Sequence, residues 1–351
     1  MTELPPIVTG PSAWYGPEVA GRTDWIERLS PTAIAEMEAA GRRLLQGDVD
    51  WQALCAEDFS LPSLEQRLLA IIHDVLEGRG FVLLRGLPVD RWGRRLSAIV
   101  FLGLGLHWGR LRSQNHHGHL LGHVKDTGVS STDPSVRIYQ TRERQNYHTD
   151  SCDVVALLCL HPARSGGLSS LVSSATIFNE MRKRRPDLAR VLFEPIETDR
   201  RGEVPDGQEP FFRIPVFNWH AGLLSAVYQR AYIESARRFP NVAPLTTEQI
   251  EALDLFDALA NDPALHFRME LLTGDMQFVH NHSLLHDRTA FEDWPEPARK
   301  RHLLRLWLAP SGARPLPPIF AQRYASIVPG KRGGVEVAGA RCAVSWDDPA
   351  T

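Results

Sequence analysis

The chain lacks any apolar run of about 18 residues, which is the length that a membrane-spanning helix requires. Its first residues, Met1 to Pro6, also lack the basic and apolar regions that define a secretory signal peptide. These absences argue against a membrane span and against secretion. The expectation is therefore a cytoplasmic protein.

Neither sign of charge is in excess, because 39 lysines and arginines stand against 42 aspartates and glutamates. A net charge of −3 offers no electrostatic attraction for nucleic acid or a membrane surface. Cysteine is scarce and shows no C-x-x-C spacing; the four cysteines are Cys55, Cys152, Cys159 and Cys342. We expect reduced thiols, a small-molecule substrate, and no nucleic-acid or membrane partner, with homo-oligomerisation left open.

The chain does contain a set of residues suited to metal binding. His148 and Asp150 are two residues apart, so on an extended strand their side chains would point to the same face. His286, far downstream, supplies a second imidazole. Two imidazoles and one carboxylate can occupy one face of an octahedral metal and leave the opposite positions open, as in non-heme Fe(II) oxygenases. The three residues therefore predict a catalytic metal centre.

Two arginines interrupt an apolar segment near the C-terminal end. On a strand, Arg301, Arg305 and Trp307 would share one face. A buried arginine needs an anionic partner, and its planar group matches a carboxylate through two parallel hydrogen bonds. The pair predicts an anionic ligand inside the fold. The alternative is that both guanidinium groups reach solvent at the rim.

Four motifs in this order resemble the taurine dioxygenase (TauD/TfdA) family of Fe(II)/2-oxoglutarate oxygenases. The motifs are Tyr147-His148-Thr149-Asp150, Ser165-Gly166-Gly167-Leu168-Ser169, Leu285-His286-Asp287-Arg288-Thr289-Ala290-Phe291, and the pair Arg301 and Arg305. The resemblance extends from about Gly80 to Arg314. The spacing between His286 and Arg301 is closer to that of the clavaminate synthase type, and a sulfonate substrate is not supported.

The resemblance implies a role for individual residues. The iron ligands would be His148, Asp150 and His286. Arg301 would bind the distal carboxylate of 2-oxoglutarate, with Ser169 hydrogen-bonded to the same carboxylate. Arg305 would match an arginine that often meets an anionic group of the primary substrate. The implied cofactors are Fe(II), 2-oxoglutarate as co-substrate, and O2.

Other histidines compete for these roles, since the chain has 14. His280 and His282 also alternate and are alternatives to His286 as the third ligand, but the position before Arg301 favours His286. A second group contains His116, His117, His119 and His123. Because only Asp126 is a nearby carboxylate, this group is interpreted as a polar loop at the mouth of the pocket rather than as a metal site.

Candidate substrate contacts surround these motifs. Gln114 and Asn115 precede the histidine-rich loop, and Tyr139 precedes the first metal motif. Arg305 completes this set. Residues 199–203 form a polar stretch that either contributes a cation to the substrate or is a solvated charged loop, and the second interpretation is favoured.

The pattern along the chain predicts a mixed α and β fold with a double-stranded β-helix (jelly-roll) core. Expected helices cover residues 31–45, with Ser30 as cap, and residues 63–76, 176–192 and 246–260. Expected strands cover residues 80–86, 154–160, 168–173, 265–272, 276–280 and 302–308. We expect a single domain over residues 1–351: a helical N-terminal extension (1–79), a core with inserts (80–309) and an irregular tail (310–351).

The function that follows is an Fe(II)/2-oxoglutarate-dependent dioxygenase. It would oxidise, most simply hydroxylate, an aliphatic C–H bond of a small carboxylate- or amino-acid-like substrate and release succinate and CO2. Two alternatives use the same residues: a Zn(II) hydrolase at the His/Asp/His site, and a jelly-roll protein that binds a small anion or metal without turnover. The arginine pair favours the oxygenase, because a hydrolase needs no buried site for a dicarboxylate.

Overall fold

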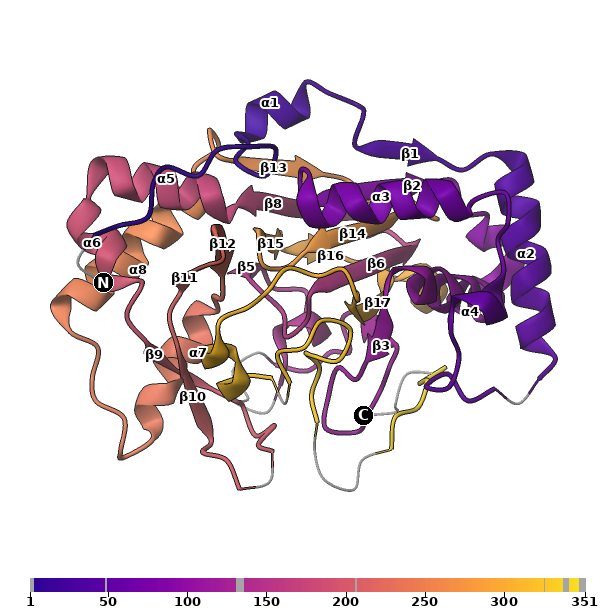
Figure 1. The fold of residues 1–351 in the computed structure, drawn as a ribbon. Coiled ribbons are helices and arrows are strands. Elements are labelled where there is room, and N and C mark those ends of the chain that lie inside the picture. The colour runs from indigo at the N-terminus through magenta and orange to yellow at the C-terminus, as the bar shows by residue number, and fades with distance from the viewer. Residues whose placement is uncertain are drawn as a thin grey trace.

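The structure is a computed structural model that describes residues 3–47, 49–130, 136–205, 207–324, 326–336 and 341–346. It has a mixed α and β fold, as the sequence predicts, with sheets in the middle and helices on both sides (Figure 1). The helices are α1 (Gly16–Ala20), α2 (Pro31–Leu45), α3 (Glu65–Glu77), α4 (Val89–Trp108), α5 (Ser174–Arg184), α6 (Pro186–Val191), α7 (Arg230–Ser235) and α8 (Thr247–Ala260). Short 3-10 turns are η1 (Ala56–Phe59), η2 (Ile138–Gln140), η3 (Ala236–Arg238), η4 (Pro297–Arg299) and η5 (Pro318–Gln322).

The larger sheet is seven-stranded and carries most of the long strands. Its strands are β1 (Ile26–Arg28), β2 (Phe81–Arg85), β3 (Arg110–Arg112), β4 (Gly122–Val124), β6 (Val154–His161), β14 (Met276–His280) and β17 (His302–Ala309). The order is β1-β2-β14-β6-β17-β3, with β4 also paired to β17. Every residue of β17 is buried, because α4 packs on one face of the sheet and a second sheet faces the other.

The smaller sheet is four-stranded, in the order β13-β8-β15-β5. Its strands are β5 (Gln145–His148), β8 (Ser169–Ser173), β13 (His266–Met269) and β15 (Leu284–Arg288). Three two-stranded ribbons complete the set: β7 (Ser165–Gly166) with β16 (Phe291–Glu292), β9 (Ile196–Asp199) with β10 (Phe211–Ile214), and β11 (Phe217–His220) with β12 (Leu223–Ala226). One hydrophobic cluster joins the two large sheets, with Val155 and Leu303 from one and Leu171 and Phe267 from the other.

Local signals account for the helix boundaries. The Ser30 side chain accepts a hydrogen bond from the Ala33 amide at the start of α2, and Thr246 caps α8 in the same way. The single helix expected over residues 176–192 is wrong, since two helices, α5 and α6, meet at Arg185. Pro186 opens the second of them, because proline removes a backbone donor and disfavours a helical conformation before it.

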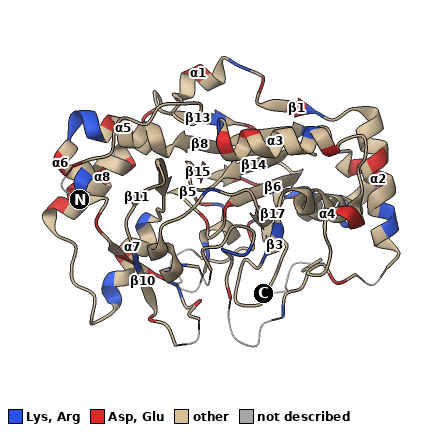
Figure 2. Cartoon of the chain, in the orientation of Figure 1, with Lys and Arg blue, Asp and Glu red and all other residues tan. Residues whose placement is uncertain are grey.

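Both ends of the chain contribute to the sheet or to the cavity lining, which the sequence did not predict. The N-terminal segment, predicted to be helical, also supplies β1, which pairs in parallel with β2. The C-terminal tail runs below the sheets, as its yellow trace shows (Figure 1), and reaches the cavity described below. Both acidic and basic residues lie on the outer helices α2 and α3 (Figure 2), in keeping with the balanced charge. Within the described residues, no helix combines the length and apolar character needed to span a membrane.

Candidate active site

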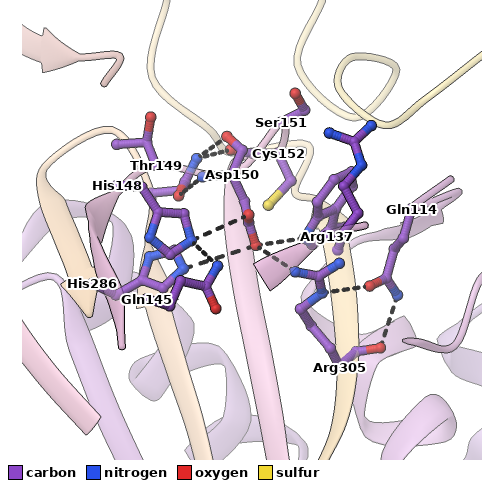
Figure 3. Close-up of polar contacts among 12 residues, drawn as sticks. Gln114, Arg137, Gln145, His148, Thr149, Asp150, Ser151, Cys152, His286 and Arg305 are labelled. Carbon is purple, nitrogen blue, oxygen red and sulfur yellow. Dashed lines mark hydrogen bonds and ion pairs between the residues drawn. The ribbon is translucent and has the colours of Figure 1, made fainter. Parts of the chain in front are cut away.

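Two strands of the smaller sheet place the two candidate histidine ligands side by side. His148 at the end of β5 is the direct cross-strand partner of His286 on β15, and their ring centroids lie 4.1 Å apart. The Asp150 carboxylate faces both: Oδ1 is 3.7 Å from His148 Nε2, and Oδ2 is 3.9 Å from His286 Nε2 (Figure 3). One potential ligand atom from each residue lies within 4.8 Å of the others, so a single metal ion can contact all three.

Asp150 reaches this position by a route that differs from the prediction. The expectation that His148 and Asp150 share one strand is wrong, because β5 ends at His148. Asn281 holds the following turn instead: its Oδ1 accepts from the Asp150 amide at 2.8 Å, and its Nδ2 donates to the Cys152 carbonyl at 2.9 Å. A residue 131 positions away therefore aims the carboxylate at the histidines.

The hydrogen bonds leave the correct histidine nitrogen available to a metal. His148 Nδ1 lies 2.8 Å from the Asn146 carbonyl, which only a protonated nitrogen can approach as a donor. Nε2 of the neutral ring then keeps its lone pair and faces Asp150. In this structure the Gln145 amide donates to the same Nε2 at 2.9 Å, so a bound metal ion would take the place of this hydrogen bond (Figure 3). This arrangement is the usual way in which a second hydrogen bond orients a metal-binding imidazole.

The protonation states also suit metal binding. Burial of Asp150 acts to raise its pKa, but the Arg305 charge leads the opposing effects, and the pKa of Asp150 is lowered to about 2. Burial lowers the pKa of His286 to about 3 and also lowers the pKa of His148. At neutral pH the site thus has one carboxylate and two neutral imidazoles, which is the form that binds a divalent cation.

Arg305 and Trp307, from β17, lie directly behind the carboxylate. Trp307 Nε1 donates to Asp150 Oδ2 at 2.8 Å, and Arg305 Nη1 is 3.4 Å from the same oxygen. Gln114 Oε1 accepts from Arg305 Nε at 2.7 Å (Figure 3). Gln114 and Arg305, both candidate substrate contacts, therefore lie beside the candidate centre, and Trp307, expected on the same strand face as Arg305, donates a hydrogen bond to the carboxylate.

The competing histidines point elsewhere. His282 Nε2 is 2.9 Å from Asp153 Oδ1, and His280 Nδ1 is 2.9 Å from the Ser283 hydroxyl. Both rings are buried, and burial lowers both pKa values. Within the described part of the chain, only one group of three or more histidine, cysteine or carboxylate side chains has metal-binding geometry, and it includes neither of them.

A cavity that we call the Asp150 cavity opens beside the carboxylate and has a volume of about 130 Å³, suited to a small molecule. Its lining comes from widely separated parts of the chain and includes Gln114, Arg137, Tyr139, Gln145, His148, Asp150, Arg200, Glu203, Tyr232, Arg305, Trp307 and Arg323. Tyr139, a candidate substrate contact, is part of this lining. The C-terminal tail, expected to be irregular wrapping, contributes Arg323 and the wall at residues 334–336.

A second cavity, which we call the Arg301 cavity, lies on the other side of His148. It is lined by Tyr139, Gln145, His148, Ser169, His286, Arg288, Arg301 and Arg305, among others. Arg301 is buried and has no carboxylate partner among the described residues, and its Nη1 has no acceptor there. Burial lowers the pKa of Arg301 to about 10. An unsatisfied buried guanidinium nitrogen is costly, so this cavity fits an anionic ligand.

The glycine motif explains how Arg301 reaches this place. Gly167 has φ +66°, a conformation that favours glycine, and a Cβ there would lie 3.0 Å from Arg301 Nε. The motif also leads to Ser169, whose hydroxyl lines the Arg301 cavity but donates to Gln277 Oε1 at 2.9 Å. The Ser169 hydroxyl can therefore donate a hydrogen bond to a bound anion only if it gives up its hydrogen bond to Gln277.

Asn115 and the histidine-rich loop are not part of either cavity lining. Asn115 Oδ1 accepts from the amides of His117 and His119, so its side chain organises its own loop. His123 packs against His302, with 2.8 Å between ring nitrogens. The prediction that Asn115 contacts the substrate gains no support from this position.

Several residues at the site were not singled out from the sequence. Gln145 lies three positions before His148 on the same strand, a signal that was available. Arg137, paired with Glu203 at 2.9 Å across the Asp150 cavity, and Asn281 gave no local signal. Arg323 lies in the tail, which has no regular pattern.

Comparison with known proteins defines the class. The profile of the "Taurine catabolism dioxygenase TauD, TfdA family" matches residues 42–307. The chain is 33% identical over 319 residues to FR-33289 synthase of Streptomyces rubellomurinus (strain ATCC 31215), covering 88% of this chain and 92% of that protein. It is 32% identical over 304 residues to the taurine hydroxylase-like protein SAT17 of Stachybotrys chartarum (strain CBS 109288 / IBT 7711), covering 84% and 77%.

The fold is shared with solved oxygenases. A crystal structure of asparagine oxygenase with Fe(II), hydroxyasparagine and succinate superposes with a TM-score of 0.62 at 18% identity, covering 81% of this chain and 93% of that one. The family match and the relatives at 33% and 32% identity define the protein as an Fe(II)/2-oxoglutarate-dependent dioxygenase. It belongs to the TauD/TfdA family, as the sequence motifs predict.

Proposed function

We propose that this dioxygenase hydroxylates an aliphatic carbon of a small anionic substrate, of carboxylate or amino-acid type, at a centre held by His148, Asp150 and His286. The observation that carries the proposal is the convergence of these side chains within 4.8 Å between two cavities that share His148 and Arg305. The hydroxylated amino acid in the related asparagine oxygenase structure supports the same reaction type.

The two cavities divide the ligands. The Arg301 cavity would hold 2-oxoglutarate, because its buried guanidinium lacks a carboxylate partner among the residues that the structure describes, and the dicarboxylate supplies one. The Asp150 cavity would hold the primary substrate. Bound Fe(II) with 2-oxoglutarate supplies O2 activation and oxidation of the C–H bond, with release of succinate and CO2.

The protein's own residues orient these components. Trp307 and Arg305 fix one oxygen of Asp150, so the second oxygen, which faces His148, is presented to the metal. Tyr139 packs over the Arg305 guanidinium, with 4.9 Å between the guanidinium carbon and the ring centroid. Together these contacts hold the carboxylate rigidly, and a rigid ligand set positions the substrate carbon reproducibly.

Arg305 is open to two roles, since it lines both cavities. If it binds the substrate, Arg305→Gln should weaken substrate binding while slow decarboxylation of 2-oxoglutarate without substrate continues. If it binds the co-substrate, that uncoupled reaction should be lost and substrate affinity should not change. Its position beside Asp150 favours the first role.

We also propose that the two facing sheets form the double-stranded β-helix of the family. Residues 80–309 would form the core, the segment before it would pack alongside, and the tail from residue 310 would complete a single domain.

The test is metal analysis together with succinate release from 2-oxoglutarate, measured while small carboxylates and amino acids are screened for stimulated turnover. Iron at one equivalent and substrate-dependent succinate support the proposal. Zinc with no succinate release under any condition would contradict it and restore the hydrolase alternative. Metal binding without any turnover would point to a binding protein.

A further inference from the structure

Two arginines of the Asp150 cavity are not used by the mechanism above. Arg200 follows β9, and Arg323 follows the tail turn η5; both line the cavity. Their guanidinium carbons lie 5.3 Å and 5.5 Å from the ring centroid of Phe212 on β10. The Gln322 backbone carbonyl accepts a hydrogen bond from Arg200, so the Arg200 side chain is tied to the segment that carries Arg323.

Neither arginine has a carboxylate partner among the described residues, which sets them apart from the other arginines of this cavity. Arg137 pairs with Glu203 at 2.9 Å, and Arg305 is 3.4 Å from Asp150. Arg200 donates only to neutral oxygens, including Gln208 Oε1 at 2.6 Å. Two like charges gathered without a counter-ion are unfavourable unless an anion joins them.

Several of their donors are available to such an anion. Arg323 uses only Nε, which donates to the Ser151 hydroxyl at 3.1 Å, and both its terminal nitrogens lack partners within the described part of the chain. The same holds for Nη1 of Arg200. Burial and the neighbouring Arg323 charge lower the pKa of Arg200 to about 10, which a bound anion would reverse.

We infer that Arg200 and Arg323 form an anion subsite that binds a phosphoryl dianion of the primary substrate, either a phosphate monoester or a phosphonate. Two guanidinium groups match the charge and the several oxygens of such a group, for which arginine has a preferred geometry. Because Arg323 contacts Ser151, the residue after Asp150, the subsite is close to the metal centre. The inference rests on the proposed function and adds the chemistry of the substrate.

The binding test uses inorganic phosphate as the probe, with acetate for comparison, titrated calorimetrically into the anaerobic protein loaded with Fe(II) and 2-oxoglutarate. Phosphate should bind more tightly than acetate, and Arg200→Gln or Arg323→Gln should each weaken phosphate binding by tenfold or more. The matched control is Arg213→Gln, because Arg213 lies next to Phe212 but pairs with Glu197 on an exposed face. Thermal unfolding confirms that each variant is folded.

Two results would overturn the inference. One is phosphate binding that is no tighter than acetate binding, which makes the subsite a carboxylate site. The other is phosphate binding that the folded arginine variants do not weaken. Succinate release separates this failure from failure of the proposed function. If the protein decarboxylates 2-oxoglutarate but does not bind phosphate, only the anion subsite is rejected and the proposed function remains.

A substrate screen distinguishes the two sources of the phosphoryl group. Phosphate monoesters and phosphonates are compared, each with its counterpart lacking the phosphoryl group, for stimulated succinate release. Stimulation should require the phosphoryl group and should fall by tenfold or more at fixed low concentration in Arg323→Gln. Equal stimulation by the counterparts contradicts the inference.

Discussion

Two buried clusters of histidine and aspartate lie within a few residues of each other in the sequence, yet they differ in geometry. In the first, Asp150 faces His148 and His286 at 3.7 Å and 3.9 Å, distances that leave room for a cation between them. In the second, Asp153 is 2.9 Å from His282 and receives Arg332 in three hydrogen bonds of 2.6 to 3.1 Å.

The two clusters differ in which group supplies the positive charge that pairs with the aspartate. Arg332 is fully buried in the tail, and it already provides the cation that Asp153 needs. Asp150 has a weaker contact with Arg305, and its two oxygens face one imidazole each, Oδ1 that of His148 and Oδ2 that of His286. The same residue types therefore make a buried ion pair in one place and a candidate metal site in the other. Ligand type alone does not distinguish them.

The largest effect should come from breaking the first cluster. His148→Ala or Asp150→Ala should abolish iron binding and reduce succinate release to background, because each removes one of three ligands. The fold should survive, since both side chains border a cavity. Metal analysis and circular dichroism check both points.

A paired substitution tests the choice of histidine directly. His286→Ala should lose iron, and His282→Ala should keep it in the folded fraction. The opposite result would place the metal at the second cluster, and the interpretation of both clusters would be wrong.

Breaking the second cluster should instead affect stability. Asp153→Ala or Arg332→Met removes one partner of a buried ion pair and should lower the free energy of unfolding by about 3–5 kcal/mol. Urea unfolding measures this loss. The double variant Asp153→Leu with Arg332→Met should recover part of it, because no uncompensated charge remains. A single variant within about 1 kcal/mol of the parent would show that the pair is not structural.

The Arg301 cavity offers a smaller contrast between a charged and a neutral contact. Arg301→Leu should raise the KM for 2-oxoglutarate up to roughly a hundredfold, since a hydrogen bond to a charged group contributes about 1.5–3 kcal/mol. Ser169→Ala should change this KM far less, because a neutral hydrogen bond contributes about 0.5–1.5 kcal/mol. The Ser169 hydroxyl also already donates its hydrogen bond to Gln277. Equal small effects would place the co-substrate elsewhere.

The smallest expected effect is on the pH dependence of the free energy of unfolding. Burial acts to raise the pKa of Asp153, but hydrogen bonds from His282 and Arg332 outweigh it, and its pKa lies below the usual value. A lowered pKa in the folded state means that this stabilisation is complete above the unfolded pKa of about 3.9 and is lost as the pH falls further. The stability difference between the parent and Arg332→Met should therefore shrink below about pH 4. A difference that is constant in acid would assign the effect of Arg332 to packing rather than to charge.

The sequence by itself determined the features that depend on near neighbours and on residue chemistry. Ser30 and Thr246 predicted the starts of α2 and α8 because a capping side chain bonds to an amide three residues away. The order of the histidine, aspartate and arginine motifs predicted the family, and the class of enzyme followed, because this ligand set suits Fe(II) and a buried arginine suits a dicarboxylate.

Only the tertiary structure decided how these residues meet. Asp150 lies beyond the end of its strand and is aimed by Asn281, a long-range contact that no periodicity signals. His282 is hydrogen-bonded to Asp153, and Arg332 completes this cluster from 179 residues further along the chain. Arg323 likewise enters the cavity from an irregular tail. These placements depend on the tertiary structure, because a buried charged group is paired by whichever residue the fold brings next to it, however distant that residue is in the sequence.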